Sequence, residues 1–179
     1  MIALATCSLL GLMALNAAIT AALLARLRTV QRHVEAQGGL PDPHLPPPGT
    51  RIGAFQLPLA AGPAGELSDR ALQAGSALVG LFTTGCLQCE AVIEELEAAP
   101  PGIALVALIH VEPGTSSAAV DRLTRRTSQL GRVAQLDAQA RAAFGHGEDS
   151  GFPTLFRLDR GVVVAAGHRV SELALTPGG

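Results

Sequence analysis

The sequence ALVGLFTTGCLQC, residues 77–89, joins a hydrophobic run to a pair of cysteines. The run, residues 77–82, is continuously apolar, which is typical of a β-strand buried on both faces of a sheet. Cys86 and Cys89 follow at once, and a helix is predicted over residues 86–98. A buried strand that leads directly into a helix opens a β-α-β unit, so this stretch favours an α/β fold.

The chain beyond this stretch keeps alternating between apolar runs and helical segments. The predicted elements are, in order, a buried strand, a helix, a short strand, a short helix and two final strands, at residues 103–109, 116–130, 132–136, 138–144, 154–158 and 162–166. A tight turn at residues 159–161 joins the last two strands. This order predicts a central mixed sheet flanked by helices, parallel at first and finished by an antiparallel hairpin.

The two cysteines stand where redox chemistry is expected. Residues three apart in a first helical turn can bring their sulfurs within disulfide distance. The unpaired N–H groups and the positive dipole end of a helix stabilise a thiolate on the first of them. We therefore expect Cys86 to be the exposed nucleophile and Cys89, one turn further in, to be the more buried resolving cysteine.

Composition narrows the possible functions. The chain has 179 residues and a net charge of −2, so it lacks the basic field of a nucleic-acid-binding protein, and no nucleic-acid partner is expected. A zinc site would need a second pair of ligands beside Cys86 and Cys89, and the sequence has no other C-x-x-C and no H-x-x-x-H. No metal and no cofactor are predicted, and His110, His146 and His168 are each expected to be ordinary surface or edge histidines.

The N-terminal part of the chain predicts a membrane anchor. Its first 25 residues contain no Asp, Glu, Lys, Arg or His, and as a helix they would span roughly 37 Å, against roughly 30 Å for a hydrocarbon core. No basic residue precedes the run, as a cleaved signal peptide would require, so an uncleaved transmembrane helix is predicted at residues 1–26. Residues 27–51 are expected to form a polar helix extension and a proline-rich spacer, and residues 52–179 one compact domain.

A second motif, GFPTLFRLDRG at residues 151–161, follows the cysteine pair by about 60 residues. Together the two motifs resemble the thioredoxin fold. They are most similar to the membrane-anchored bacterial TlpA/ResA/MauD group of thiol–disulfide oxidoreductases. The resemblance covers roughly residues 52–168, and the predicted anchor and spacer also fit that group.

This resemblance implies roles for the motif residues. In that group the proline of the second motif is cis and packs opposite the disulfide, and Pro153 occupies its position. Cys86 and Cys89 would form the catalytic, redox-active disulfide. The substrate would be bound by Phe152, Pro153 and Thr154.

Some positions depart from the pattern of the group. Gly85 stands where tryptophan is common, and Gln88 where proline is frequent. Gly80 stands where thioredoxin keeps a buried acid, so proton transfer to or from Cys89 must use water or another group. From residue 170 there is room for about one and a half helical turns, so an abbreviated final helix is expected.

The resemblance also implies a function, which is the exchange of disulfides with protein substrates during maturation of cytochrome c or of periplasmic enzymes. Such a domain works outside the cytoplasm and needs a membrane electron carrier to recycle its cysteines. Arg26, Arg28 and Arg32 follow the predicted anchor and, by the positive-inside rule, favour a cytoplasmic domain instead. Because the charge rule is a bias, we predict a single-pass membrane protein with an extracytoplasmic domain.

Two other functions fit parts of the sequence. A peroxiredoxin-like antioxidant peroxidase (alkyl hydroperoxide reductase or thiol-specific antioxidant) uses a P-x-x-x-T-x-x-C site. Thr83 matches its threonine, but Val79 stands at the proline. A non-enzymatic copper or haem-assembly module would use the two thiols, but no Met or His stands beside the motif. Thiol–disulfide exchange is therefore the leading hypothesis.

Overall fold

The computed structural model describes residues 43–61, 64–99, 102–147 and 149–173, together with six separate helical positions between residues 13 and 26. The chain divides into two compact units, residues 1–40 and 41–179. Among the described residues, no helix is both long and apolar enough to cross a bilayer. Apart from the six separate positions, the predicted anchor lies outside the described residues, as does the predicted spacer before residue 43.

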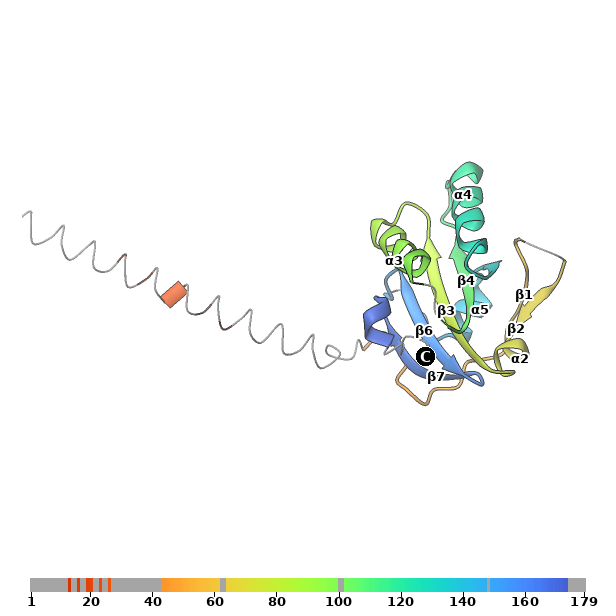
Figure 1. The fold of residues 1–179 in the computed structure, drawn as a ribbon, viewed down its shortest axis with the longest axis horizontal. Coiled ribbons are helices and arrows are strands. Elements are labelled where there is room, and N and C mark those ends of the chain that lie inside the picture. The colour runs from red at the N-terminus through yellow and green to blue at the C-terminus, as the bar shows by residue number, and fades with distance from the viewer. Residues whose placement is uncertain are drawn as a thin grey trace, which may run out of the picture. The chain divides into compact units, whose positions relative to one another are not determined.

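The second unit is built on one five-stranded sheet with the order β5-β4-β3-β6-β7 (Figure 1). In chain order its strands are β3 (Ser76–Thr83), β4 (Ala104–His110), β5 (Arg132–Gln135), β6 (Thr154–Asp159) and β7 (Val162–Gly167). β3, β4 and β5 run parallel, whereas β6 runs antiparallel to β3 and β7 runs antiparallel to β6. The predicted mixed sheet, finished by an antiparallel hairpin, is confirmed.

The helices that follow the parallel strands begin at residues whose side chains accept a free backbone N–H. The three helices are α3 (Leu87–Ala98), α4 (Ser117–Ser128) and α5 (Ala138–Ala143). The Ser116 hydroxyl caps α4 by accepting from Ala119 N–H at 3.4 Å, and the Asp137 carboxylate caps α5 by accepting from Ala140 N–H at 2.7 Å. Each of these helices lies within two residues of its predicted bounds.

Hydrophobic side chains cover both faces of the sheet, as the apolar runs predicted. In β3, Val79 and Leu81 point to one face, and Leu78 and Phe82 point to the other. The first face is covered by α5 and by the short helix α2 (Asp69–Leu72), whereas α3, α4 and the 3₁₀ helix η1 (Val170–Leu173) cover the second. Burial of this apolar surface is the dominant force that holds the layers together.

A small hairpin outside the main sheet has no counterpart among the predicted elements. β1 (Gln56–Pro58) and β2 (Glu66–Ser68) pair antiparallel, and they place Leu57 opposite Leu67. Both leucines are buried against the first face of the sheet. Strands of three residues are too short for an alternating pattern to reveal them.

The described end of the proline-rich stretch, which belongs to the second unit, packs on later parts of that unit. Gly49 N–H donates to the Val163 carbonyl on β7 at 2.8 Å, and the His44 carbonyl accepts from the Ser150 hydroxyl at 3.2 Å. This part of the predicted spacer, from residue 43 onward, therefore lies against the domain.

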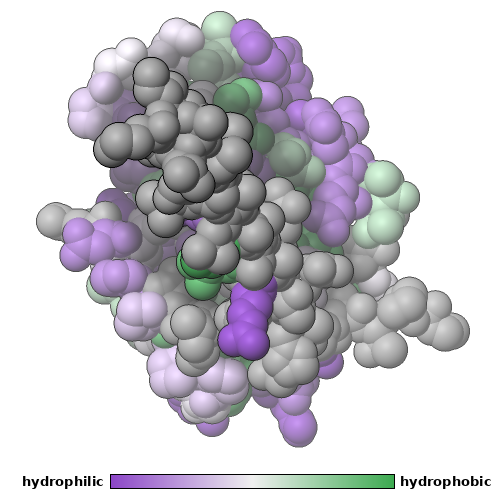
Figure 2. Space-filling model, turned by 90° about the vertical axis from the view of Figure 1, so that its left-hand side faces the viewer, coloured by the Kyte–Doolittle hydropathy of each residue, from purple (hydrophilic) through white to green (hydrophobic). Residues whose placement is uncertain are grey.

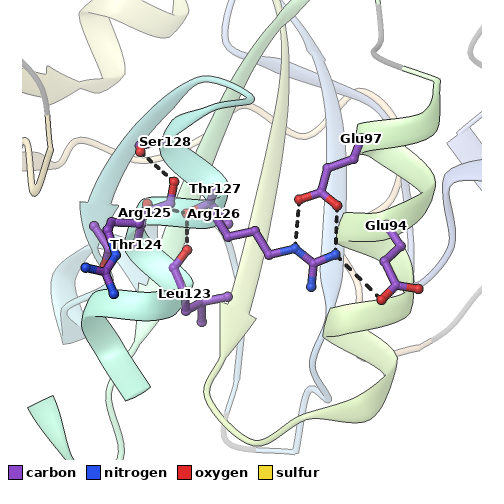
Figure 3. Close-up of polar contacts among 8 residues, drawn as sticks. All are labelled: Glu94, Glu97, Leu123, Thr124, Arg125, Arg126, Thr127 and Ser128. Atoms are coloured by element: carbon purple, nitrogen blue, oxygen red, sulfur yellow. Dashed lines mark hydrogen bonds and ion pairs between the residues drawn. The ribbon is translucent and has the colours of Figure 1, made fainter. Parts of the chain in front are cut away.

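An ion pair joins α3 to α4 (Figure 3). The Arg126 guanidinium donates two hydrogen bonds of 2.7 Å to the Glu97 carboxylate and lies 3.6 Å from a Glu94 oxygen. The hydrogen bonds lower the pKa of Glu97 and raise the pKa of Arg126, since each stabilises the charged form of the other. Both side chains are about one-third exposed, so the pair contributes at most about 1 kcal/mol.

The outward side of α3 is acidic and exposed to solvent. Its exposed acids are Glu90, Glu94, Glu95 and Glu97. On the side of the molecule drawn in Figure 2, most of the described surface is hydrophilic, and the hydrophobic colour is confined to small patches.

Candidate active site

Cys86 lies at the turn between β3 and α3. Its backbone is extended, with φ −96° and ψ 107°, and its Sγ accepts a hydrogen bond from Cys89 N–H at 3.1 Å. The sulfur therefore satisfies one of the free N–H groups at the start of the helix. Cys86 is half-buried, whereas Cys89 is only 1% exposed.

The two cysteines form a disulfide, with their Cα atoms 5.2 Å apart. In the reduced protein, a thiolate at Cys86 would face the free N–H groups and the positive end of the 12-residue helix α3. Cys89 follows inside the first turn and points into the core. The geometry thus favours Cys86 over Cys89 as the nucleophile.

Gly85 is required by the turn that presents Cys86. Its φ is +72°, in the left-handed region that residues with a Cβ avoid at a cost of roughly 1–2 kcal/mol. A tryptophan at this position, as in the group that the sequence resembles, would be strained in this turn. The departure from the pattern therefore has a local cause in the backbone of this chain.

The residues of the second motif lie directly opposite the disulfide. The Phe152–Pro153 peptide bond is cis, as the resemblance implied, and the Phe152 carbonyl oxygen lies 3.6 Å from Cys86 Sγ. Thr154 is fully buried, and its hydroxyl donates to the Gly151 carbonyl at 2.7 Å. The structure thus brings the predicted site residues together, with Thr154 supporting the loop from inside.

Cys89 borders an apolar part of the core. It belongs to a hydrophobic cluster whose other buried members are Leu78, Phe82, Val92, Ile93, Leu96, Leu105, Ala107, Ile109, Val133, Leu155 and Leu173. A Cβ added at Gly80 would overlap the buried ring of Phe82 and lie 3.2 Å from a methyl carbon of Leu155. The phenylalanine ring therefore fills the space that a buried acid at position 80 would occupy.

A cavity of about 210 Å³ reaches Cys89 from the side of α4. Its polar lining is supplied by Thr83, Thr84, Glu90, Arg122 and Arg126. Water held by these polar side chains can carry a proton to or from Cys89. This route suits a chain that has no acid at position 80.

Three histidines surround the loop that carries Phe152 and Pro153. The His110 ring stacks on the Phe152 ring with 5.4 Å between centroids, the His146 ring contacts it at 4.9 Å, and His168 Nδ1 lies 2.7 Å from the Pro153 carbonyl oxygen. The expectation of an ordinary surface or edge histidine is wrong for His146, which is 4% exposed. Because the three histidines belong to distant parts of the sequence, only the folded sheet brings them to one edge.

Burial lowers the pKa of His146 below its ordinary value of 6.5, because the imidazolium form would be poorly solvated there. Nearby Arg141, His110 and His168 act in the same direction, and the hydrogen bond to the Gly151 carbonyl acts against them. The unfolded chain binds the proton more readily, so this group's contribution to stability is present above pH 6.5 and is lost as the pH falls below it.

Comparison with known proteins identifies the fold. No family model and no curated protein matches the sequence. Among solved structures, the chain is similar to the thioredoxin domain of a thiol-disulfide oxidoreductase from Bacteroides vulgatus, with 16% identity and a TM-score of 0.55 over 72% of this chain and 93% of that one.

Two further solved structures show the same likeness. A thioredoxin-family thiol:disulfide interchange protein from Chlorobium tepidum TLS is 19% identical, with a TM-score of 0.52 over 74% of this chain and 99% of its own. A thio-disulfide isomerase from Thermus thermophilus is 20% identical, with a TM-score of 0.52 over 69% of this chain and 87% of its own. These likenesses confirm the thioredoxin-like fold predicted from the two motifs.

The packing of Phe82 over Gly80 can be tested by adding one methyl group. Gly80→Ala is expected to destabilise the domain by about 1–3 kcal/mol, since the methyl must displace a fully buried ring. Denaturant unfolding followed by circular dichroism measures the change. Gly75→Ala is the matched control, because a Cβ there meets nothing within 4 Å. Equal stability of the two variants would show that the ring leaves room at position 80.

Proposed function

We propose that this chain is a thiol–disulfide oxidoreductase that exchanges disulfides with protein substrates through Cys86 and Cys89. The observation that carries the proposal is a disulfide at the N-terminus of α3 that faces the cis-proline loop, with 3.6 Å between Cys86 Sγ and the Phe152 carbonyl oxygen. The three similar structures belong to a thiol-disulfide oxidoreductase, a thiol:disulfide interchange protein and a thio-disulfide isomerase, so the same kind of activity is described for those proteins.

In the reducing direction, the Cys86 thiolate attacks one sulfur of the substrate disulfide. That S–S bond breaks, and the other substrate sulfur leaves as a thiolate, which takes up a proton. Cys89 gives its proton to water and attacks Cys86 Sγ, which releases the second substrate sulfur. The substrate gains two electrons, and the two cysteines lose them as they form their disulfide. Oxidation of a substrate is the reverse sequence, and the relative reduction potentials set the direction.

A polypeptide substrate suits the surroundings of Cys86. Cys86 is half-buried rather than enclosed, and Gly151, which precedes the Phe152 carbonyl, is exposed. An extended segment of a substrate protein can pair with exposed main chain of this kind, which is a general mode of peptide recognition. Pro153 has no N–H that would compete for the same space.

The environment of Thr83 offers little support to the peroxidase alternative. The Thr83 hydroxyl donates to the His110 carbonyl at 3.2 Å, and Val79 is fully buried within β3. As for the copper or haem-assembly alternative, the described part of the chain holds no group of three or more His, Cys, Asp or Glu side chains placed to bind a metal ion.

The proposed location of the domain in the cell rests on its N-terminal segment and its resemblance to a known group. We propose that residues 1–26 anchor the chain in the cell membrane, that the domain lies outside the cytoplasm, and that a membrane electron carrier recycles the cysteines. The uncharged first 25 residues support the anchor. The resemblance to the TlpA/ResA/MauD group supports the orientation and a role in maturing cytochrome c or periplasmic enzymes, against the bias of Arg26, Arg28 and Arg32.

The proposed roles of Cys86 as nucleophile and Cys89 as resolving cysteine predict two different mutant phenotypes. Cys86→Ser is expected to abolish insulin reduction, since it removes the nucleophile. Cys89→Ser should accumulate mixed disulfides with substrate proteins, because nothing then resolves them. Non-reducing electrophoresis and mass spectrometry of the trapped species make the measurement, with Cys7→Ser as the control. Trapping by the Cys86 variant would reverse the assignment.

The membrane orientation predicts the accessibility of Cys86 in whole cells. After mild reduction of intact cells, a membrane-impermeant maleimide is expected to label Cys86, because the domain is proposed to lie outside the cytoplasm. Peptide mass spectrometry identifies the labelled cysteine, and a cytoplasmic thiol protein serves as the control for intactness. Labelling of Cys86 only after lysis would place the domain in the cytoplasm.

A further inference from the structure

His146 holds the residue next to the carbonyl group that faces the active sulfur. The Phe152 carbonyl oxygen lies 3.6 Å from Cys86 Sγ. The preceding carbonyl, of Gly151, accepts from the Thr154 hydroxyl at 2.7 Å and lies 3.3 Å from His146 Nε2. Two side chains therefore fix the peptide unit next to the one that contacts the disulfide.

On the other side of the same loop, His168 contacts the main chain. The ring of Phe152, which belongs to the loop, lies against two histidine rings. The Pro153 carbonyl lies 2.7 Å from His168 Nδ1. The Phe152 ring contacts the His146 ring at 4.9 Å and is stacked on the His110 ring, with 5° between the planes. His146 meets both the main chain, at the Gly151 carbonyl, and the Phe152 ring.

The hydrogen-bonding pattern determines which ring nitrogen of His146 carries the proton. A carbonyl oxygen only accepts, so the contact with Gly151 requires the proton on Nε2. Nδ1 is buried and has no hydrogen-bond partner among the described residues. Its charged or titratable neighbours are Arg141 on α5, His110 at the end of β4 and His168 after β7, and each disfavours a second proton. The neutral ring with Nε2–H is the form that holds the loop.

We propose that His146 is a positioning residue for Cys86. By holding the Gly151 carbonyl and the Phe152 ring, it fixes the Phe152 carbonyl where the reduced Cys86 thiol donates its S–H. The proposal rests on the proposed function only in taking Cys86 as the reactive thiol. A hydrogen bond to the neutral thiol opposes its ionisation, so the loop restrains the thiolate that the helix end favours.

Three substitutions separate the two contacts of His146. His146→Phe keeps a ring beside Phe152 but removes the N–H donor, His146→Gln keeps an N–H donor but removes the ring, and His146→Ala removes both. The probe is iodoacetamide, and the measured quantity is its rate of reaction with Cys86 in the reduced full chain as a function of pH. Peptide mass spectrometry separates Cys86 from Cys89 and Cys7.

His146→Ala is expected to shift the pH profile of Cys86 alkylation toward lower pH and to raise the rate near neutral pH roughly two- to fivefold. The Phe and Gln variants should shift it less. Asp149→Asn is the control, since Asp149 is an exposed residue of the same loop. The pH profile of Cys86 alkylation in this variant should match that of the unmodified chain. An unchanged profile in folded His146→Ala would overturn the proposal.

A second measurement needs no substitution, so a variant that fails to fold does not end the test. In the ¹⁵N NMR spectrum of the unmodified chain, His146 is expected to carry its proton on Nε2 at neutral pH, and its signals should move when the disulfide is reduced. A proton on Nδ1, or identical signals in both redox states, would overturn the proposal. Insulin reduction by the same samples tests the proposed function separately, because alkylation of Cys86 requires no disulfide exchange.

Discussion

Antiparallel pairing between β3 and β6 brings together the two halves of the candidate active site. Thr154 lies opposite Leu81, so the turn after β3 and the loop before β6 meet at the same edge of the sheet. Cys86 and the Phe152 carbonyl therefore come within 3.6 Å of each other across 66 residues of sequence. A slip of one residue would turn the side chains of β6 to the wrong faces, so burial on both sides of the sheet fixes the register.

At this edge of the sheet, neighbouring groups act in opposite directions on the ionisation of the Cys86 thiol. The N–H groups at the start of α3 favour a negative charge on Cys86, as the hydrogen bond from Cys89 N–H already indicates. The Phe152 carbonyl favours the neutral thiol, and the histidines around the loop determine where that carbonyl sits. Cys89 instead borders apolar side chains and a small cavity that is lined in part by polar side chains. The two thiols thus have different surroundings, which is what sequential attack and resolution require.

Sequence reasoning succeeded where the signal is local. The apolar runs of β3 and β4, the helical segments of α4 and α5, and the spacing of the cysteines all depend on residues close in sequence. The β1–β2 hairpin could not be found because its strands are three residues long. The contacts of His146, and the Phe82 ring that fills the space beside Gly80, were also beyond sequence reasoning. The partners of His146 come from separate elements, and the position of the Phe82 ring is known only from the folded core.

The central claim is that Cys86 and Cys89 act together as one reversible two-electron couple. Redox titration of the full chain against defined ratios of reduced and oxidised dithiothreitol, with the thiols trapped and identified by mass spectrometry, tests it most directly. The account predicts a single transition with a slope for two electrons, in which Cys86 and Cys89 become oxidised together while Cys7 does not take part. Independent oxidation of the two cysteines, or a transition that involves Cys7, would contradict it.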